Sequence, residues 1–187
     1  MQRGKASQQW FLKFSAAQLR LCFSRATGDH TLFVKTCADG HFLAVLVYVD
    51  DIIVASTNAS KSKELIQNLS QQFKLRDLGV LKYFLDLEIA QSSESISVCQ
   101  RKYALETLSS IGMLGCKPIS TPMVLNLHLS IDEGAPIENP EMRQSLVGRL
   151  MYLTITRPYI TYAVNKLCQY SSAPKLPHLQ AVYKVLH

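Results

Sequence analysis

The chain has 187 residues, of which 48% are hydrophobic and 18% are charged, and its formal net charge at pH 7 is +6. This balance is that of a globular protein with one sizeable core or two small ones, and it excludes a mainly disordered chain. The positive charge favours an anionic partner, most simply a phosphate backbone.

Five cysteines are widely spaced along the chain. They form no C-x-x-C pair, which argues against a zinc site and predicts buried, reduced thiols. The first residues lack the apolar core of a signal peptide, and the longest apolar run, residues 42–49, is too short to span a bilayer. We therefore expect an intracellular, soluble protein.

Helices and strands alternate in the first hundred residues. Apolar side chains recur one to two turns apart from Trp10 to Leu21, which predicts a helix with one buried face. Alternating and β-branched runs predict strands, and an Asp-Gly pair marks the turn between the first two. In chain order the expected elements are a helix over 8–23, strands over 31–37, 42–49 and 52–56, a helix capped by Asn58, Ser60 or Ser62, and strands over 81–90 and 95–99. This order predicts an α+β fold with an antiparallel sheet and packed helices.

The second half of the chain is predicted to be helical. A helix from residue 100 ends at Gly112, and a segment with four prolines between residues 115 and 140 predicts an irregular linker. Three more helices are expected over residues 141–154, 159–170 and 179–187.

Two adjacent carboxylates, Asp50 and Asp51, lie between two strongly apolar runs. Such runs predict a hairpin that holds the acidic pair rigidly at the end of the sheet. Carboxylate oxygens are the ligands that hard cations such as Mg²⁺ prefer. The simpler alternative is a polar hairpin turn, which aspartate also favours.

Sequence motifs spread over nearly the whole chain resemble one family in the same order. They are LVYVDDII at residues 46–53, DLGVLKYFL at 77–85, QRKYA at 100–104, STPM at 120–123, LVGRLMYLT at 146–154, TRP at 156–158 and PHLQAV at 177–182. Together they resemble the reverse transcriptase of copia-type retrotransposon Pol polyproteins. The resemblance implies a partial polymerase palm over residues 1–99, a thumb helix and proline-containing linker over 100–140, and a helical thumb or connection segment over 141–187, which stops before a ribonuclease H domain.

The resemblance also implies the roles of individual residues. Asp50 would bind the metal as a catalytic residue with Asp51 as its less directly engaged neighbour, and Tyr48 and Val49 would lie beneath the primer end. The cofactor would be Mg²⁺, and the partners would be an RNA or DNA template-primer, deoxynucleoside triphosphates and the rest of the Pol polyprotein, in the cytoplasm or a virus-like particle. The remaining implied positions are a primer-grip-like strand with Phe84, Leu85, Asp86 and Leu87, and possible phosphate contacts at Arg149, Lys166 and Lys175.

The chain departs from the family pattern at three places. The family uses a third carboxylate upstream of the first helix, and no acidic residue precedes that helix here. Lys5 stands where a nucleotide-contacting glutamine is expected, and Asp86 stands where the pattern usually has glycine. Asp29 and Asp39 are the nearest other carboxylates, and neither is expected to complete the site.

These departures leave more than one function open. We expect a truncated RNA-directed DNA polymerase that is inactive alone. The alternative is a non-catalytic nucleic-acid-binding remnant of a decayed element. A phosphoreceiver domain, which also holds Mg²⁺ with an acidic pair, is disfavoured because the residues after Asp51 continue as a strand.

Overall fold

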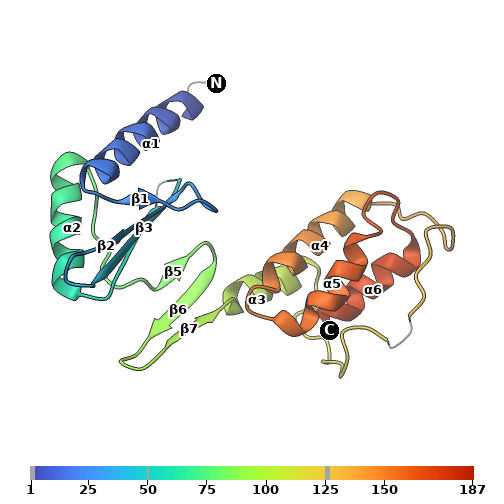
Figure 1. The fold of residues 1–187 in the computed structure, drawn as a ribbon. Helices are drawn as coiled ribbons and strands as arrows, with labels where there is room; N and C mark the ends of the chain where they lie inside the picture. Colours follow the sequence, from blue (N-terminus) through green and yellow to red (C-terminus); the bar gives the residue numbers. More distant parts are fainter. Residues whose placement is uncertain (1–2, 50, 125–126) are drawn as a thin grey trace. The chain divides into compact units, whose positions relative to one another are not determined.

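The computed structural model describes residues 3–49, 51–124 and 127–187. It divides into two compact units, Met1–Leu81 and Lys82–His187 (Figure 1). The boundary between the two units lies between residues 81 and 82. The hairpin that follows residue 82 therefore belongs to the same compact unit as the C-terminal helices.

The first unit is an α+β arrangement in its described part. An antiparallel four-stranded sheet has the order β1-β2-β3-β4. The elements are α1 (Arg3–Arg20), β1 (Ser24–Arg25), β2 (Leu32–Thr36), β3 (Phe42–Tyr48), β4 (Asp51–Ser56) and α2 (Ala59–Gln72). The three-stranded meander was predicted correctly, whereas the short β1 was not predicted. Helix α1 also begins and ends earlier than the predicted span of residues 8–23.

One face of this sheet carries the core. Along β3, Leu43, Val45 and Val47 are buried, as the period of two in a strand requires. They form one hydrophobic cluster with residues of both helices, including Phe14 of α1 and Leu69 of α2. Both helices therefore pack on the same face and hold the β3–β4 hairpin in place.

Helix α2 begins where the sequence provides a cap. The side chain of Asn58 accepts hydrogen bonds from the backbone N–H groups of Ser60 and Lys61, at 2.9 and 3.3 Å. These bonds satisfy donors that the first helical turn leaves without partners. Of the three predicted caps, Asn58 is the residue used.

The second unit begins with a three-stranded antiparallel sheet of order β5-β6-β7. Its strands are β5 (Tyr83–Phe84), β6 (Leu87–Gln91) and β7 (Ile96–Cys99). The predicted continuous strand over residues 81–90 is wrong, because the chain reverses at Leu85 and Asp86 and Phe84 pairs with Leu87. Phe84 to Leu87 therefore form the tip of a hairpin and not one strand.

Helices make up the rest of the second unit. They are α3 (Arg101–Ser110), α4 (Pro140–Leu153), the 3₁₀ turn η1 (Pro158–Ile160), α5 (Thr161–Cys168) and α6 (Leu176–Leu186). Gly112 has a φ of 71° two residues after α3, as predicted for a helix stop. The helix predicted over 159–170 is split into η1 and a shorter α5.

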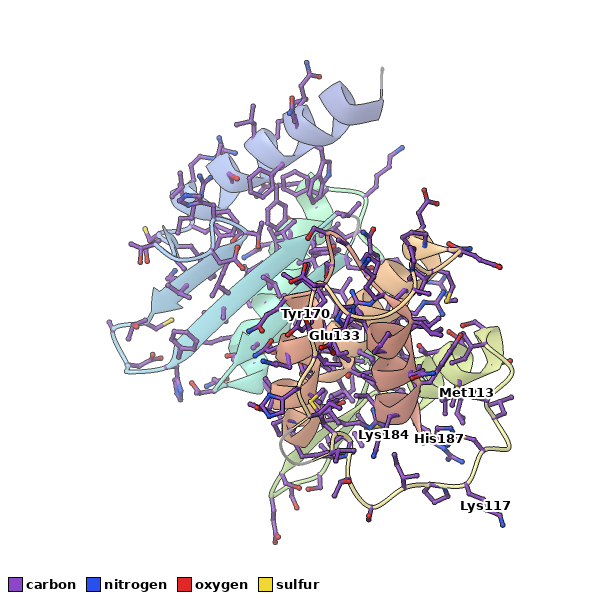
Figure 2. All side chains as sticks on the ribbon, turned by 90° about the vertical axis from the view of Figure 1, so that its right-hand side faces the viewer. Met113, Lys117, Glu133, Tyr170, Lys184 and His187 are labelled. Atoms are coloured by element: carbon purple, nitrogen blue, oxygen red, sulfur yellow. The ribbon has the colours of Figure 1, made fainter. Side chains whose placement is uncertain are left out.

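The proline-containing linker between α3 and α4 is fixed against the C-terminal helices. The hydroxyl group of Tyr170 donates to the carbonyl of Leu129 at 2.7 Å, and the carbonyl of Lys117 lies 3.1 Å from Nδ1 of His187; the side chains of Tyr170, Lys117 and His187 are labelled in Figure 2. Pro136 also forms an isolated β-bridge with Lys175. The linker is therefore irregular, as predicted, and held by several contacts.

Two other predictions concern the cysteines and membrane-spanning segments. All five cysteines are free thiols, but Cys22 and Cys99 are exposed and the other three are half-buried, so the predicted full burial is wrong. Within the described ranges, no helix is long and apolar enough to cross a membrane.

Candidate active site

The turn between β3 and β4 is the centre of the candidate active site. Tyr48 pairs with Asp51, so the loop between the strands is two residues long. Val49, the first of these two, has a φ of 51°. A positive φ is a clear outlier for a β-branched residue, because its side chain crowds the backbone. Backbone outliers of this kind cluster at functional sites.

Two described side chains at this turn, those of Val49 and Asp51, are exposed to solvent. Val49 is 66% exposed, and Asp51 is exposed at the first position of β4. Asp50, predicted as the metal-binding carboxylate, lies outside the described residues. The arrangement places the Asp51 carboxylate at an open tip, where a hard cation has access.

Neither of the other nearby carboxylates is available to this tip. Asp39 lies in the β2–β3 turn, at the opposite end of the sheet, and forms an ion pair with Lys61. Asp29 accepts hydrogen bonds from the Thr31 backbone and hydroxyl group, at 2.8 and 2.6 Å. The Thr31 hydroxyl lowers the pKa of Asp29, and Lys61 lowers that of Asp39. Both carboxylates are therefore ionised and engaged locally.

An open groove of about 470 Å³ lies beside the tip. Trp10 and Phe11 of α1 line it together with Val47 and Val49. It adjoins the turn directly, since Val49 belongs to both. The acidic tip is therefore bordered by an apolar surface.

The predicted primer-grip segment has a different geometry from the one expected. Leu85 and Asp86 have φ values of 47° and 61°, so they form a two-residue turn in the left-handed region. Asp86 is exposed at this turn, whereas the Glu88 carboxylate accepts a hydrogen bond from the backbone N–H of Lys102 at 2.8 Å. Glu88 therefore caps the start of α3, whereas Asp86 lies in the turn.

The basic residues of the helices differ in accessibility. Arg149 is half-buried and donates from Nη1 to the hydroxyl oxygen of Ser110 at 3.0 Å. Lys166 and Lys175 are half-buried, at the end of α5 and at the start of α6. Arg143 is fully buried and donates to the Leu167 carbonyl at 2.7 Å, so its guanidinium group is not accessible to a phosphate.

Comparisons with known proteins agree with the motifs. The model of the family "Reverse transcriptase (RNA-dependent DNA polymerase)" matches residues 3–125. The chain is 34% identical over 182 residues to the Retrovirus-related Pol polyprotein from transposon RE1 of Arabidopsis thaliana, covering 97% of this chain and 12% of that polyprotein. It is 41% identical over 142 residues to an uncharacterized mitochondrial protein of Arabidopsis thaliana, covering 76% of this chain and 59% of that protein.

A third relative comes from another plant. The Retrovirus-related Pol polyprotein from transposon TNT 1-94 of Nicotiana tabacum is 28% identical over 192 residues, covering 97% of this chain and 14% of the polyprotein. No solved structure matches the chain significantly. The chain thus spans about an eighth of the Pol polyproteins that it matches, at 12% and 14% of their lengths. These matches and the described hairpin show that the chain belongs to the reverse transcriptase family, in the form found in copia-type retrotransposon Pol polyproteins.

Proposed function

We propose that the β3–β4 turn is the metal-holding part of an RNA-directed DNA polymerase. The observation that carries this proposal is the positive φ of Val49 in the turn that ends at the exposed Asp51. A plain polar turn would be formed more readily with Asn-Gly or Asp-Gly at its centre than with a β-branched residue. The strain at Val49 is therefore better explained by a function of the tip than by turn formation alone.

The residues present fit a hard divalent cation. Mg²⁺ is usually bound by one or two carboxylates together with waters and substrate phosphates. Asp50 and Asp51 supply such oxygen ligands by sequence, and Asp51 is exposed. When bound, the cation would supply charge neutralisation for phosphoryl transfer. Tyr48 and Val49 would orient the primer end beside the groove, and Trp10 and Phe11 would border that position.

The helices of the second unit are proposed to contact the phosphates of a template-primer duplex. The formal net charge of +6 supports an anionic partner, and Arg149, Lys166 and Lys175 retain partial exposure. The hairpin tip at Leu85 and Asp86 is proposed to approach the primer strand. Such contacts would position a duplex without reading its sequence.

The 187 residues by themselves are proposed not to extend a primer. Polymerase chemistry uses two metal ions, which need more carboxylates than one adjacent pair. Asp29 and Asp39 are engaged elsewhere, with Thr31 and with Lys61. The chain would then supply the acidic hairpin to a larger polymerase.

Two assays on the purified chain test these proposals separately. Mn²⁺ binding, followed by its electron paramagnetic resonance signal, should be weak and should disappear in Asp50→Asn/Asp51→Asn. The control variant Lys13→Gln/Lys63→Gln keeps both carboxylates and should bind Mn²⁺ as the parent chain does. Primer extension with Mg²⁺ and deoxynucleoside triphosphates should not exceed that of Asp50→Asn. Mn²⁺ binding that survives the double substitution would contradict the metal site, and extension above the Asp50→Asn level would contradict the inactivity.

The second candidate is a nucleic-acid-binding module without catalysis. The basic helices favour it because their contribution to binding does not depend on the acidic tip. In that case, duplex affinity would be unchanged by a chelator and by Asp50→Asn. A polymerase fragment whose tip holds a cation against the primer should instead bind the duplex more tightly with Mg²⁺ than with the chelator.

A further inference from the structure

The tip of the β5–β6 hairpin is bound to a helix far away in the sequence. The hydroxyl group of Tyr152 on α4 donates a hydrogen bond to the backbone carbonyl of Leu85, 67 residues earlier. The Tyr152 ring packs edge-to-face on Tyr103 of α3, with 5.0 Å between ring centroids. The ring is therefore held by α3 while its hydroxyl group reaches the turn.

Three further hydrogen bonds tie the same hairpin and helices together. The fully buried Gln100, between β7 and α3, donates from Nε2 to the Tyr152 carbonyl at 3.2 Å and accepts from the Thr156 hydroxyl at 2.7 Å. From β6, the Glu88 carboxylate accepts from the N–H of Lys102 at the start of α3. The Tyr152 carbonyl and the start of α3 are thus both held by the hairpin and the residue that follows it.

The turn itself is one that its residues do not favour. Leu85 and Asp86 are both in the left-handed region, which costs a leucine free energy relative to glycine and which aspartate tolerates better than leucine. Neither glycine nor asparagine is present to lower that cost. The hydrogen bond from Tyr152 to the Leu85 carbonyl offsets this free-energy cost within the turn itself.

We propose that Tyr152 is a positioning residue for this tip, because its hydroxyl group fixes the Leu85–Asp86 turn against α4. The hairpin and the helices then form one rigid surface that contacts a template-primer. The functional part rests on the proposed function, in which the tip approaches the primer and the helices contact the duplex. The positioning part rests on the contacts alone. The two parts can therefore be tested separately.

The first test measures amide hydrogen exchange in the 187-residue chain. Tyr152→Phe removes the hydroxyl group and keeps the ring on Tyr103. Exchange should accelerate about two- to tenfold at residues 84–89, the range expected for one hydrogen bond, and should not change in α5 and α6. The matched control is Tyr159→Phe, which removes a hydroxyl group from a side chain that is 71% exposed.

Two exchange results would overturn the positioning role. Unchanged exchange at residues 84–89 would mean that the hydroxyl group does not hold the turn. An equal acceleration throughout the second unit would mean that Tyr152 contributes only to global stability.

The second test measures affinity for a primed duplex across a salt series. Tyr152→Phe should weaken binding about two- to tenfold and leave the slope of log affinity against log salt unchanged, because no charge is removed. If the parent chain binds no duplex, the proposed function fails, while hydrogen exchange still decides the positioning role. If the parent binds and Tyr152→Phe binds equally well, the tip does not contribute to the duplex surface.

Discussion

The backbone N–H of Lys175 donates a hydrogen bond to Nδ1 of His178 at 2.8 Å, so the imidazole caps the start of α6 as an acceptor. His178 is fully buried and stacks on Tyr170, with 4.2 Å between ring centroids. Nδ1 can accept this bond only while it carries no proton. Burial lowers the pKa of His178, and the nearby positive charge of Arg143 lowers it further.

The free energy of unfolding of the second unit should therefore fall in acid. In the unfolded chain a histidine takes up its proton near pH 6.5, whereas the folded state resists protonation until lower pH. The stability should be constant above about pH 7 and decline below about pH 6.5, by at most about 1.4 kcal/mol per pH unit for one group. Urea unfolding at a series of pH values, followed by far-ultraviolet circular dichroism, measures it.

The control for this prediction is His178→Asn. Its side-chain oxygen can accept the same N–H but does not titrate. The decline between pH 6.5 and 5 should become shallower in the variant. Identical pH profiles for both proteins would show that other groups cause the acid sensitivity.

The second prediction concerns Asp86, which has a φ of 61°. Asp86→Gly should stabilise the second unit by up to about 1 kcal/mol, because removal of the side chain relieves left-handed strain and outweighs the added freedom of the unfolded chain. Asp132→Gly is a matched control in an exposed linker residue without a positive φ, and it should be slightly destabilising. Equal effects of the two substitutions on the urea midpoint would argue against strain at the turn.

The third prediction concerns Gly134 in the linker. Its φ is 94°, and a Cβ atom placed on it would lie 2.5 Å from Cδ of Pro177. Gly134→Ala should therefore destabilise the second unit by about 1–3 kcal/mol through overpacking and backbone strain. Gly148 lies within α4 with open space around it, so Gly148→Ala should be stabilising by up to about 1 kcal/mol. Thermal unfolding of both variants measures these changes in stability. An unchanged stability of Gly134→Ala would show that the linker can move away from Pro177.

Local patterns were sufficient for much of the first unit. The β3–β4 hairpin follows from two β-branched runs around a polar pair, and Asn58 is a favoured residue at a helix N-terminus. The same patterns placed Asp51 at the end of a strand. The positive φ of Val49 could not be predicted, because valine is not a residue that signals such a turn.

The second unit shows where local patterns are insufficient. Residues 81–90 read as one strand because Leu85 and Asp86 lack a turn signature, and the contact that supports the turn comes from Tyr152, 67 residues away. Arginine is mostly an exposed residue, whereas the guanidinium group of Arg143 is buried and donates to the Leu167 carbonyl. Both features depend on long-range contacts that a single sequence does not reveal.

The fourth prediction tests whether the helices of the second unit bind nucleic acid. In a chain with reversed charge at Arg149, Lys166 and Lys175, duplex binding should weaken and the log-log salt slope should flatten by about 0.9 for each phosphate contact removed. The matched control reverses the charge of Lys13, Lys63 and Lys74, three exposed residues of the first unit, so both variants have the same net charge. Circular dichroism must first show that each variant is folded, because Arg149 also donates to Ser110.

The comparison of the two variants decides between local contacts and general attraction. If specific helical residues contact phosphates, only the first variant should lose slope. Equal losses in both variants would mean that the net charge of the chain, and not a surface on its helices, is responsible for binding. A strong preference of the parent chain for one base sequence would also contradict the proposal, because phosphate contacts carry no direct sequence information.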